Sequence, residues 1–87
     1  MSKAVKLRQK FLRRPPPKDF TWAELVLTMD HFGFELDESG GGSHKHFVMR
    51  LDENIVIDTH RPHPNGIMFA IQLIEIAKKL KSIGLIE

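Results

Sequence analysis

The sequence predicts a small α+β domain with the order helix-strand-strand-strand-helix, in which two helices cover one face of a three-stranded antiparallel sheet. Hydrophobic residues repeat at helical spacing near both ends of the chain, and they alternate with polar residues in the middle. The chain has 87 residues, and a typical domain has about 100–150, so we expect one domain. We place this domain at residues 19–87, after a basic N-terminal arm and proline linker at residues 1–18.

The N-terminal arm differs from the rest of the chain in its charge. Residues 1–18 contain seven Lys or Arg and no acidic residue, whereas the remainder contains six basic and eleven acidic residues. We expect such an arm to contact phosphates or an acidic partner, or else to remain a solvated tail. Pro15–Pro17 separates the arm from the domain, because each proline disfavours helix in the residue before it. Ala4, Leu7 and Phe11 have the spacing of one short helix.

The first helix of the domain is predicted at about residues 21–32. Thr21 and Glu24 match a capping box, in which each residue's side chain accepts a hydrogen bond from the other's backbone N–H. Gly33 supplies the left-handed residue that commonly ends a helix. The face expected to lie in the core carries Trp22, Leu25, Met29 and Phe32.

Three strands are predicted from residues that alternate between apolar and polar. They lie at about residues 34–38, 43–51 and 55–60. The side chains expected to face the core in the second and third strands are Phe47, Met49, Leu51, Ile55, Ile57 and Thr59. The opposite face is expected to remain open to solvent.

The loop between the second and third strands sets the expected register of the hairpin. Asp52–Asn54 is typical of a three-residue hairpin loop. Leu51 would then pair with Ile55, and His46 would stand opposite His60. A slip of one residue would place apolar side chains opposite polar ones, which favours this register.

The last helix is predicted at about residues 66–83, capped by Asn65 and ended by Gly84. Its expected core face carries Phe69, Leu73, Ile76, Leu80 and Ile83. Three further isoleucines are expected on the opposite side: Ile67, Ile71 and Ile74. We expect them to pack against a partner protein, a second copy of the chain or the N-terminal arm folded back as a short helix, or else to belong to a wider core. The lysines near its C-terminus, which fit the negative end of the helix dipole, are Lys78, Lys79 and Lys81.

Several classes of protein are excluded by composition. Cysteine is absent, which excludes a disulfide scaffold, a thiolate zinc finger and a cysteine nucleophile. The longest apolar run, Ile67–Ile71, is far shorter than the ~20 residues that span a bilayer. The basic N-terminus lacks the apolar stretch of a secretory signal. We therefore expect a cytoplasmic protein with no membrane partner.

Histidines are concentrated in the second half of the predicted sheet. Strand alternation puts His44, His46 and His60 on the open face, with Asp58 beside them and His63 just past the strand end. Imidazole titrates near neutral pH and therefore suits proton transfer. Imidazole and carboxylate groups also bind zinc.

From the residues alone, three interpretations of this face remain open. The imidazoles can catalyse RNA cleavage, as acid and base at a phosphodiester. They can instead bind a metal, through the four histidines and Asp58. The third interpretation is an exposed polar surface without chemistry. Lys45 and Arg61 lie beside the histidines in sequence, where they could meet a phosphate, and the glycines before His44 would let backbone N–H groups approach an anion.

A family resemblance favours the first interpretation. Gly42–His44 followed by Phe47, the segment His60–Pro64, and a last helix ending near Ile83–Leu85 resemble the HicA family of bacterial toxins. The resemblance covers about residues 19–86, which leaves the basic arm outside it.

The resemblance implies a fold like that of a double-stranded-RNA-binding domain and activity as an mRNA interferase, a ribonuclease that cleaves transcripts. It also implies a HicB-type antitoxin as partner, which we expect on the three isoleucines named above. The catalytic histidine of the family corresponds to His44. We therefore expect a metal-independent endoribonuclease without a cofactor. Its expected catalytic residues are His44, His60 and His63, and its expected RNA-binding residues are Gly42, Ser43, Lys45, His46 and Arg61. The alternative is a non-catalytic RNA-binding domain of the same fold.

Overall fold

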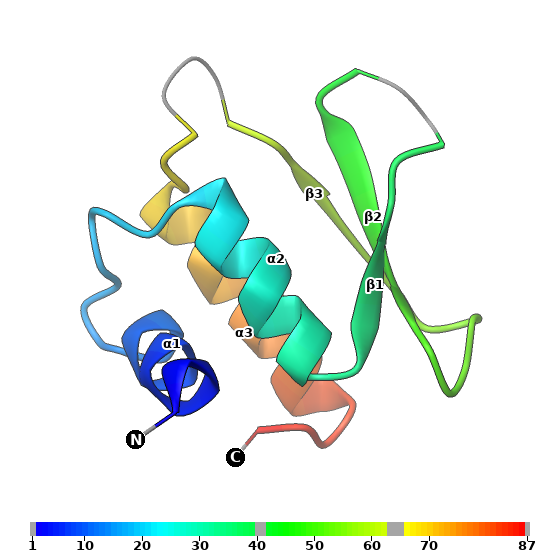
Figure 1. Cartoon of the computed structure of the whole chain (residues 1–87), viewed down its shortest axis with the longest axis horizontal. Coiled ribbons are helices and arrows are strands. Elements are labelled where there is room, and N and C mark those ends of the chain that lie inside the picture. The colour runs from blue at the N-terminus through cyan, green and yellow to red at the C-terminus, as the bar shows by residue number, and fades with distance from the viewer. Residues whose placement is uncertain (1, 40–41, 63–65, 87) are drawn as a thin grey trace.

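The computed structural model describes residues 2–39, 42–62 and 66–86 (Figure 1). Its elements are α1 (Lys3–Phe11), α2 (Trp22–His31), β1 (Phe34–Asp37), β2 (His44–Met49), β3 (Val56–His60) and α3 (Ala70–Ser82). The predicted α+β class is confirmed. The elements α2, β1, β2, β3 and α3 follow the expected order, and α1 precedes them. Within the described ranges, no helix is long and apolar enough to cross a membrane.

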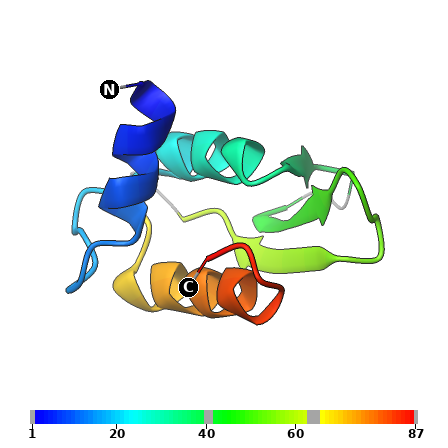
Figure 2. The same ribbon diagram turned by 90° about the horizontal axis from the view of Figure 1, so that it is seen from below.

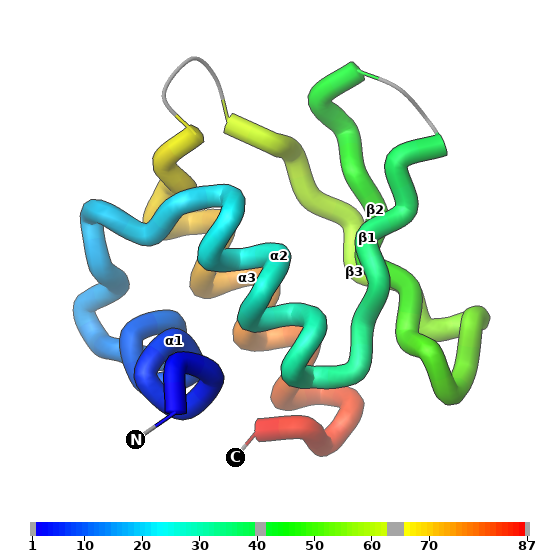
Figure 3. Tube along the Cα trace, in the orientation of Figure 1, coloured from blue at the N-terminus to red at the C-terminus, as the bar shows by residue number. Residues whose placement is uncertain are grey.

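The three strands form an antiparallel sheet in the order β1-β2-β3, so that β2 is central. Helices α2 and α3 lie on one side of this sheet (Figures 1 and 2). Helix α1 lies on the side of the helical layer that is away from the sheet. The chain trace in Figure 3 shows that the β2–β3 hairpin leaves its other face uncovered by any helix.

The capping box predicted at the start of α2 is present. The backbone N–H of Glu24 donates to Thr21 Oγ1 at 3.1 Å, and the backbone N–H of Thr21 donates to Glu24 Oε1 at 3.0 Å. Lys10 Nζ also donates to both carboxylate oxygens of Glu24, at 3.2 Å each. The same carboxylate therefore caps α2 and joins it to α1.

The short helix predicted within the basic arm is present as α1, and it packs into the core. Phe11 is fully buried, and its ring centroid lies 5.9 Å from that of Phe20 and 6.4 Å from that of Phe32. Leu7 is buried on the same face of α1. Of the two alternatives for the arm, the solvated tail is therefore wrong for this helix, because its apolar stripe fills the space beside α2.

The register of the β2–β3 hairpin differs from the prediction by two residues. His44 stands opposite His60 and Phe47 opposite Ile57, whereas we expected His46 opposite His60. A shift of two residues leaves every side chain on its predicted face, so the alternation could not exclude it. Leu51, expected in the core, is 94% exposed in the loop.

Arg50 provides the physical reason for the wider loop. Its backbone N–H donates to Gly33 O at 2.9 Å, which extends the pairing of β2 with the start of β1. Its guanidinium bonds Asp30 and, at 3.3 Å, Glu35 Oε1. These bonds hold residue 50 on the β1 side, so residues 50–54 are all needed to reach β3. Pairing with the third strand resumes at Ile55, whose carbonyl accepts a hydrogen bond from the Met49 N–H at 3.0 Å.

The last helix begins later than predicted. Phe69 is its N-cap, with extended backbone angles, and its ring is 63% exposed rather than in the core. Residues 66–68 instead bond to residues 20–22, at the start of α2: the Trp22 N–H donates to Gly66 O at 2.7 Å, and the Met68 N–H donates to Phe20 O at 2.8 Å. This pairing keeps residues 66–68 extended. The predicted cap Asn65 lies outside the described residues.

The predicted core face of the last helix is confirmed at Leu73, Ile76 and Leu80, but Ile83 is exposed. The three remaining isoleucines do not form one surface. Ile67 pairs with Thr21 before the helix, Ile71 is 61% exposed, and Ile74 is half-buried. The single partner seam expected there is therefore wrong, because residue 67 does not belong to the helix.

Phe11→Ala should destabilise the protein by about 3–5 kcal/mol, since it leaves a cavity between α1 and α2. The matched control is Phe69→Ala, which removes an exposed ring and should change the free energy of unfolding by less than about 0.5 kcal/mol. Urea unfolding followed by circular dichroism measures both. Equal losses in the two variants would mean that α1 does not belong to the core.

Acidification should weaken the junction between α1 and α2. Burial alone would raise the pKa of Glu24, but hydrogen bonds from Thr21 and Lys10 hold it below its ordinary value of 4.5. The stabilisation from the charged form is therefore complete above about pH 4.5 and is lost as the pH falls through the lower pKa of the folded state.

Glu24→Gln should lower stability at pH 7 and reduce the further loss on acidification, as measured by thermal unfolding between pH 3 and 7. Glu53→Gln, in the exposed hairpin loop, is the control and should keep the pH dependence of the unaltered chain. If the Glu24→Gln variant loses as much stability on acidification as the unaltered chain, the Glu24 carboxylate is not the source of that loss.

Candidate functional site

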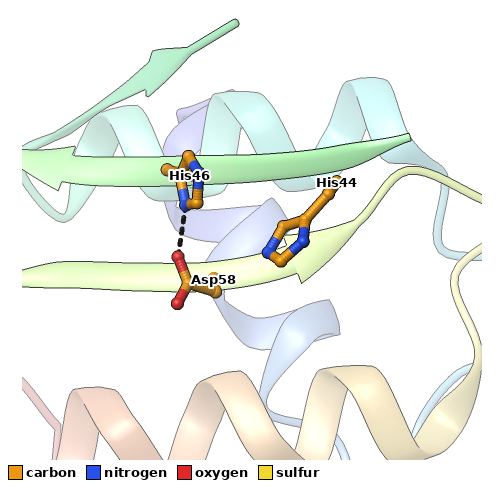
Figure 4. A group of neighbouring side chains, drawn as sticks. All are labelled: His44, His46 and Asp58. Atoms are coloured by element: carbon orange, nitrogen blue, oxygen red, sulfur yellow. Dashed lines mark hydrogen bonds and ion pairs between the residues drawn. The ribbon is translucent and has the colours of Figure 1, made fainter. Parts of the chain in front are cut away.

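The open face of the β2–β3 hairpin carries a cluster of titratable side chains (Figure 4). Figure 4 shows His44 and His46 on β2 and Asp58 on β3. His60 also belongs to β3, where it stands opposite His44. His44, Asp58 and His60 are exposed and His46 is partly exposed, whereas Phe47 and Ile57 on the other face are buried. The prediction that the three histidines share the open face is confirmed.

Within this cluster, the imidazole of His44 occupies the middle position. Its ring centroid lies 4.7 Å from that of His60, at an interplanar angle of 34°. It lies 5.0 Å from that of His46, at an interplanar angle of 39°. The first contact follows from the observed register, since His44 and His60 are direct cross-strand partners. A group bound at His44 would therefore have the imidazole of His60 on one side and that of His46 on the other.

His46 is held by an acidic partner on the neighbouring strand. Its Nδ1 pairs with Asp58 Oδ1, directly across the ladder (Figure 4). This hydrogen bond is the main reason why the pKa of Asp58 lies below its ordinary value, and the positive charges of His46, His44 and Lys79 act in the same direction. Asp58 is therefore a carboxylate at neutral pH and fixes the orientation of the His46 ring.

The same side chains have a geometry suited to a metal ion. His44, His46 and Asp58 each offer one ligand atom, and these three atoms lie within 4.8 Å of one another. Zinc is commonly held by three protein ligands of this kind, with a fourth position left to water or substrate. Of the four histidines considered as ligands, the described structure brings two into such a group.

The loop before β2 meets the chain after β3 at one end of the hairpin. The Arg61 N–H donates to Ser43 O at 2.7 Å, which extends the ladder by one pair beyond His44 and His60. Gly42 has a φ of +63°, in the region that side chains disfavour. Gly42, Ser43 and Arg61, three of the residues that we expected to bind RNA, thus lie at the same end of the hairpin as His44. His63 lies outside the described residues.

Lys45 does not belong to this face. It lies between His44 and His46 in the strand, so its side chain points toward the helices, and it is only 8% exposed. We expected a phosphate contact because Lys45 is adjacent to the histidines in sequence, but adjacent residues of a strand point to opposite faces. The alternation that placed the histidines should have excluded it.

Lys79, which we expected only to interact with the helix dipole, is a basic residue beside the site. It lines a pocket of about 190 Å³ between β3 and α3, together with Asp58, His60 and Gln72. Gln72 Nε2 donates to His60 O at 2.9 Å and so ties α3 to this strand. The tertiary fold brings Lys79 here, and no local pattern in the sequence indicates it.

Two basic residues of the N-terminal arm lie on a different surface from the histidines. Arg8 and Arg14 line a groove of about 820 Å³ with Lys78 and Lys81 of α3, over an apolar floor that includes Ile74. The guanidinium of Arg8 also lies 4.9 Å from the Phe32 ring centroid. The chain thus has a second basic surface, which is distinct from the histidine face.

Comparison with known proteins adds no relative to this description. No protein-family model, no curated protein and no solved structure matches the chain.

Proposed function

We propose that this protein is an endoribonuclease that cleaves mRNA by histidine acid–base catalysis, without a metal ion as cofactor. The observation that carries the proposal is the exposed His44 imidazole, which has a second imidazole about 5 Å away on either side. The resemblance to HicA toxins at Gly42–His44 supports the same assignment.

The chemistry requires two proton transfers on opposite sides of one phosphate. A base takes the proton of the 2′-hydroxyl, whose oxygen then attacks phosphorus, and an acid gives a proton to the departing 5′-oxygen. The products are a 2′,3′-cyclic phosphate and a free 5′-hydroxyl. Imidazole serves both roles near neutral pH. We assign His44 as the principal acid–base group and His60, its cross-strand neighbour, as the complementary one, with His63 as a further member of the site.

The pentavalent intermediate carries additional negative charge, which nearby cations must stabilise. Lys79 lies in the pocket shared with His60, and Arg61 follows His60 directly in the chain. Asp58 keeps the His46 ring in one orientation, so that His46 can donate a hydrogen bond to a phosphate oxygen. Gly42 and Ser43 position the RNA backbone at the end of the hairpin.

The open sheet face is a suitable platform for single-stranded RNA because no helix covers it and it presents exposed histidines beside the apolar Val48 and Val56. We propose mRNA as the substrate, a HicB-type antitoxin as the neutralising partner, and the cytoplasm as the location, so that the protein is the toxin of a type II toxin–antitoxin system.

His44→Ala should reduce RNA cleavage by about 10²–10⁴-fold, because a general acid–base group is lost. The measurement is single-turnover cleavage of an unstructured RNA in the presence of a chelator. His31→Ala, which removes an exposed histidine at the end of α2, is the matched control and should cleave at the original rate.

Circular dichroism should show both variants folded, since neither residue is in the core. Full cleavage by a folded His44→Ala variant would falsify the assignment of His44. If the unaltered chain binds the RNA and never cleaves it, the alternative of a non-catalytic RNA-binding domain is correct.

Lys79→Gln should reduce the cleavage rate by about 10-fold or more, because it removes positive charge beside His60. Lys78→Gln is a close control: it is the adjacent residue, carries the same charge, and lines the other groove. The two variants have the same net charge, so comparing their rates separates a local effect from general attraction of RNA. Equal rates would exclude Lys79 from the site.

A further inference from the structure

We propose that His44, His46 and Asp58 form a binding site for zinc, and that zinc bound there switches the protein off. The binding site rests on the geometry of these three side chains alone. The inhibition also rests on the proposed function, because it requires that His44 act in cleavage.

The backbone of the hairpin brings the three ligands together. His46 and Asp58 are direct partners across the β2–β3 ladder, and His44 lies two residues before His46 on the same face. One ligand atom from each lies within 4.8 Å of the other two. Tetrahedral zinc with bonds of about 2.0–2.2 Å separates its ligand atoms by about 3.4 Å. The His44 ring must rotate to close this gap, and zinc must replace the hydrogen bond between His46 Nδ1 and Asp58 Oδ1. All three side chains are at least partly exposed, so these movements meet no packed neighbour on the solvent side.

The ligand types favour zinc over the hard divalent cations. Two imidazoles and one carboxylate are a common set of zinc ligands, whereas Mg²⁺ prefers oxygen ligands in an octahedron. The site is exposed, so water can take the fourth position. The one basic side chain that acts on Asp58 from α3 is Lys79, and its charge opposes that of the bound cation.

Zinc and catalysis compete for the same atom. A ring nitrogen of His44 that is bonded to zinc has no lone pair to accept a proton, and it carries no proton to donate. His60 lies beside His44 but outside the group of three ligands. The ribonuclease should therefore be active when the site is empty and inactive when it is filled.

The binding experiment is isothermal titration of the untagged, chelator-treated full chain with Zn²⁺. The unaltered protein should bind one ion, and Mg²⁺ should give no binding. His44→Ala, His46→Ala and Asp58→Asn should each weaken binding by about 10-fold or more, since each removes a ligand. His60→Ala is the matched control, from the same sheet face, and should bind zinc as the unaltered protein does. Lys79→Gln should bind zinc more tightly.

Two results would overturn the zinc site: no binding of Zn²⁺ by the unaltered chain, or equal binding by the Asp58→Asn variant in its folded form. Loss of binding in His60→Ala would also contradict the assigned ligand set. Visible absorption of the Co²⁺-substituted protein gives an independent readout, because tetrahedral Co²⁺ absorbs far more strongly than the aqueous ion.

Inhibition is measured separately, as RNA cleavage with Zn²⁺ and after its removal by chelator. Cleavage that falls with the same concentration dependence as binding supports the switch, and cleavage that continues at saturating Zn²⁺ overturns it. If Zn²⁺ binds but the chelated protein does not cleave RNA, the proposed ribonuclease function fails and the zinc site stands.

Discussion

The pairing of β2 with β3 in one register is the constraint on which the functional face depends. Antiparallel neighbours place directly opposite side chains within about 5.5 Å of each other, so the register decides which groups can react or bind together. In the observed register His44 meets His60 and His46 meets Asp58. In the register displaced by two residues, His46 would meet His60, and Asp58 would lie opposite Val48. His46, rather than His44, would then be the middle imidazole, and the ion pair of His46 with Asp58 would be lost.

Bonds at both ends of the hairpin maintain this register. At the loop, Arg50 is drawn to the β1 side by Gly33, Asp30 and Glu35, so the turn toward β3 needs additional residues. At the other end, the hydrogen bond from Arg61 to Ser43 continues the ladder. The site lies between these two anchors. The large apolar side chains of the core lie on the other face of the sheet, so the exposed histidines are not needed for packing.

The two proposed uses of the histidine face overlap at His44, His46 and Asp58. Cleavage needs His44, a second imidazole and positive charge, which His60 and Lys79 supply from the β3–α3 side. Zinc needs the imidazoles of His44 and His46 and the carboxylate of Asp58. His44 is needed as the acid–base group in cleavage and as a ligand in zinc binding, and the two uses therefore exclude each other.

The sequence by itself determined the features that depend on near neighbours in the chain. The capping box of Thr21 and Glu24 spans three residues, and the placement of three histidines on one sheet face follows from alternation along each strand. The tertiary structure decided what depends on distant partners. Two registers satisfied the same alternation, and the bonds of Arg50 to Asp30 and Glu35 selected between them. Phe69 fitted the helical spacing, but pairing of residues 66–68 with the start of α2 kept the helix from reaching it. Lys79 came to His60 only through the packing of α3 on β3, since 19 positions separate them in sequence and no local period relates them.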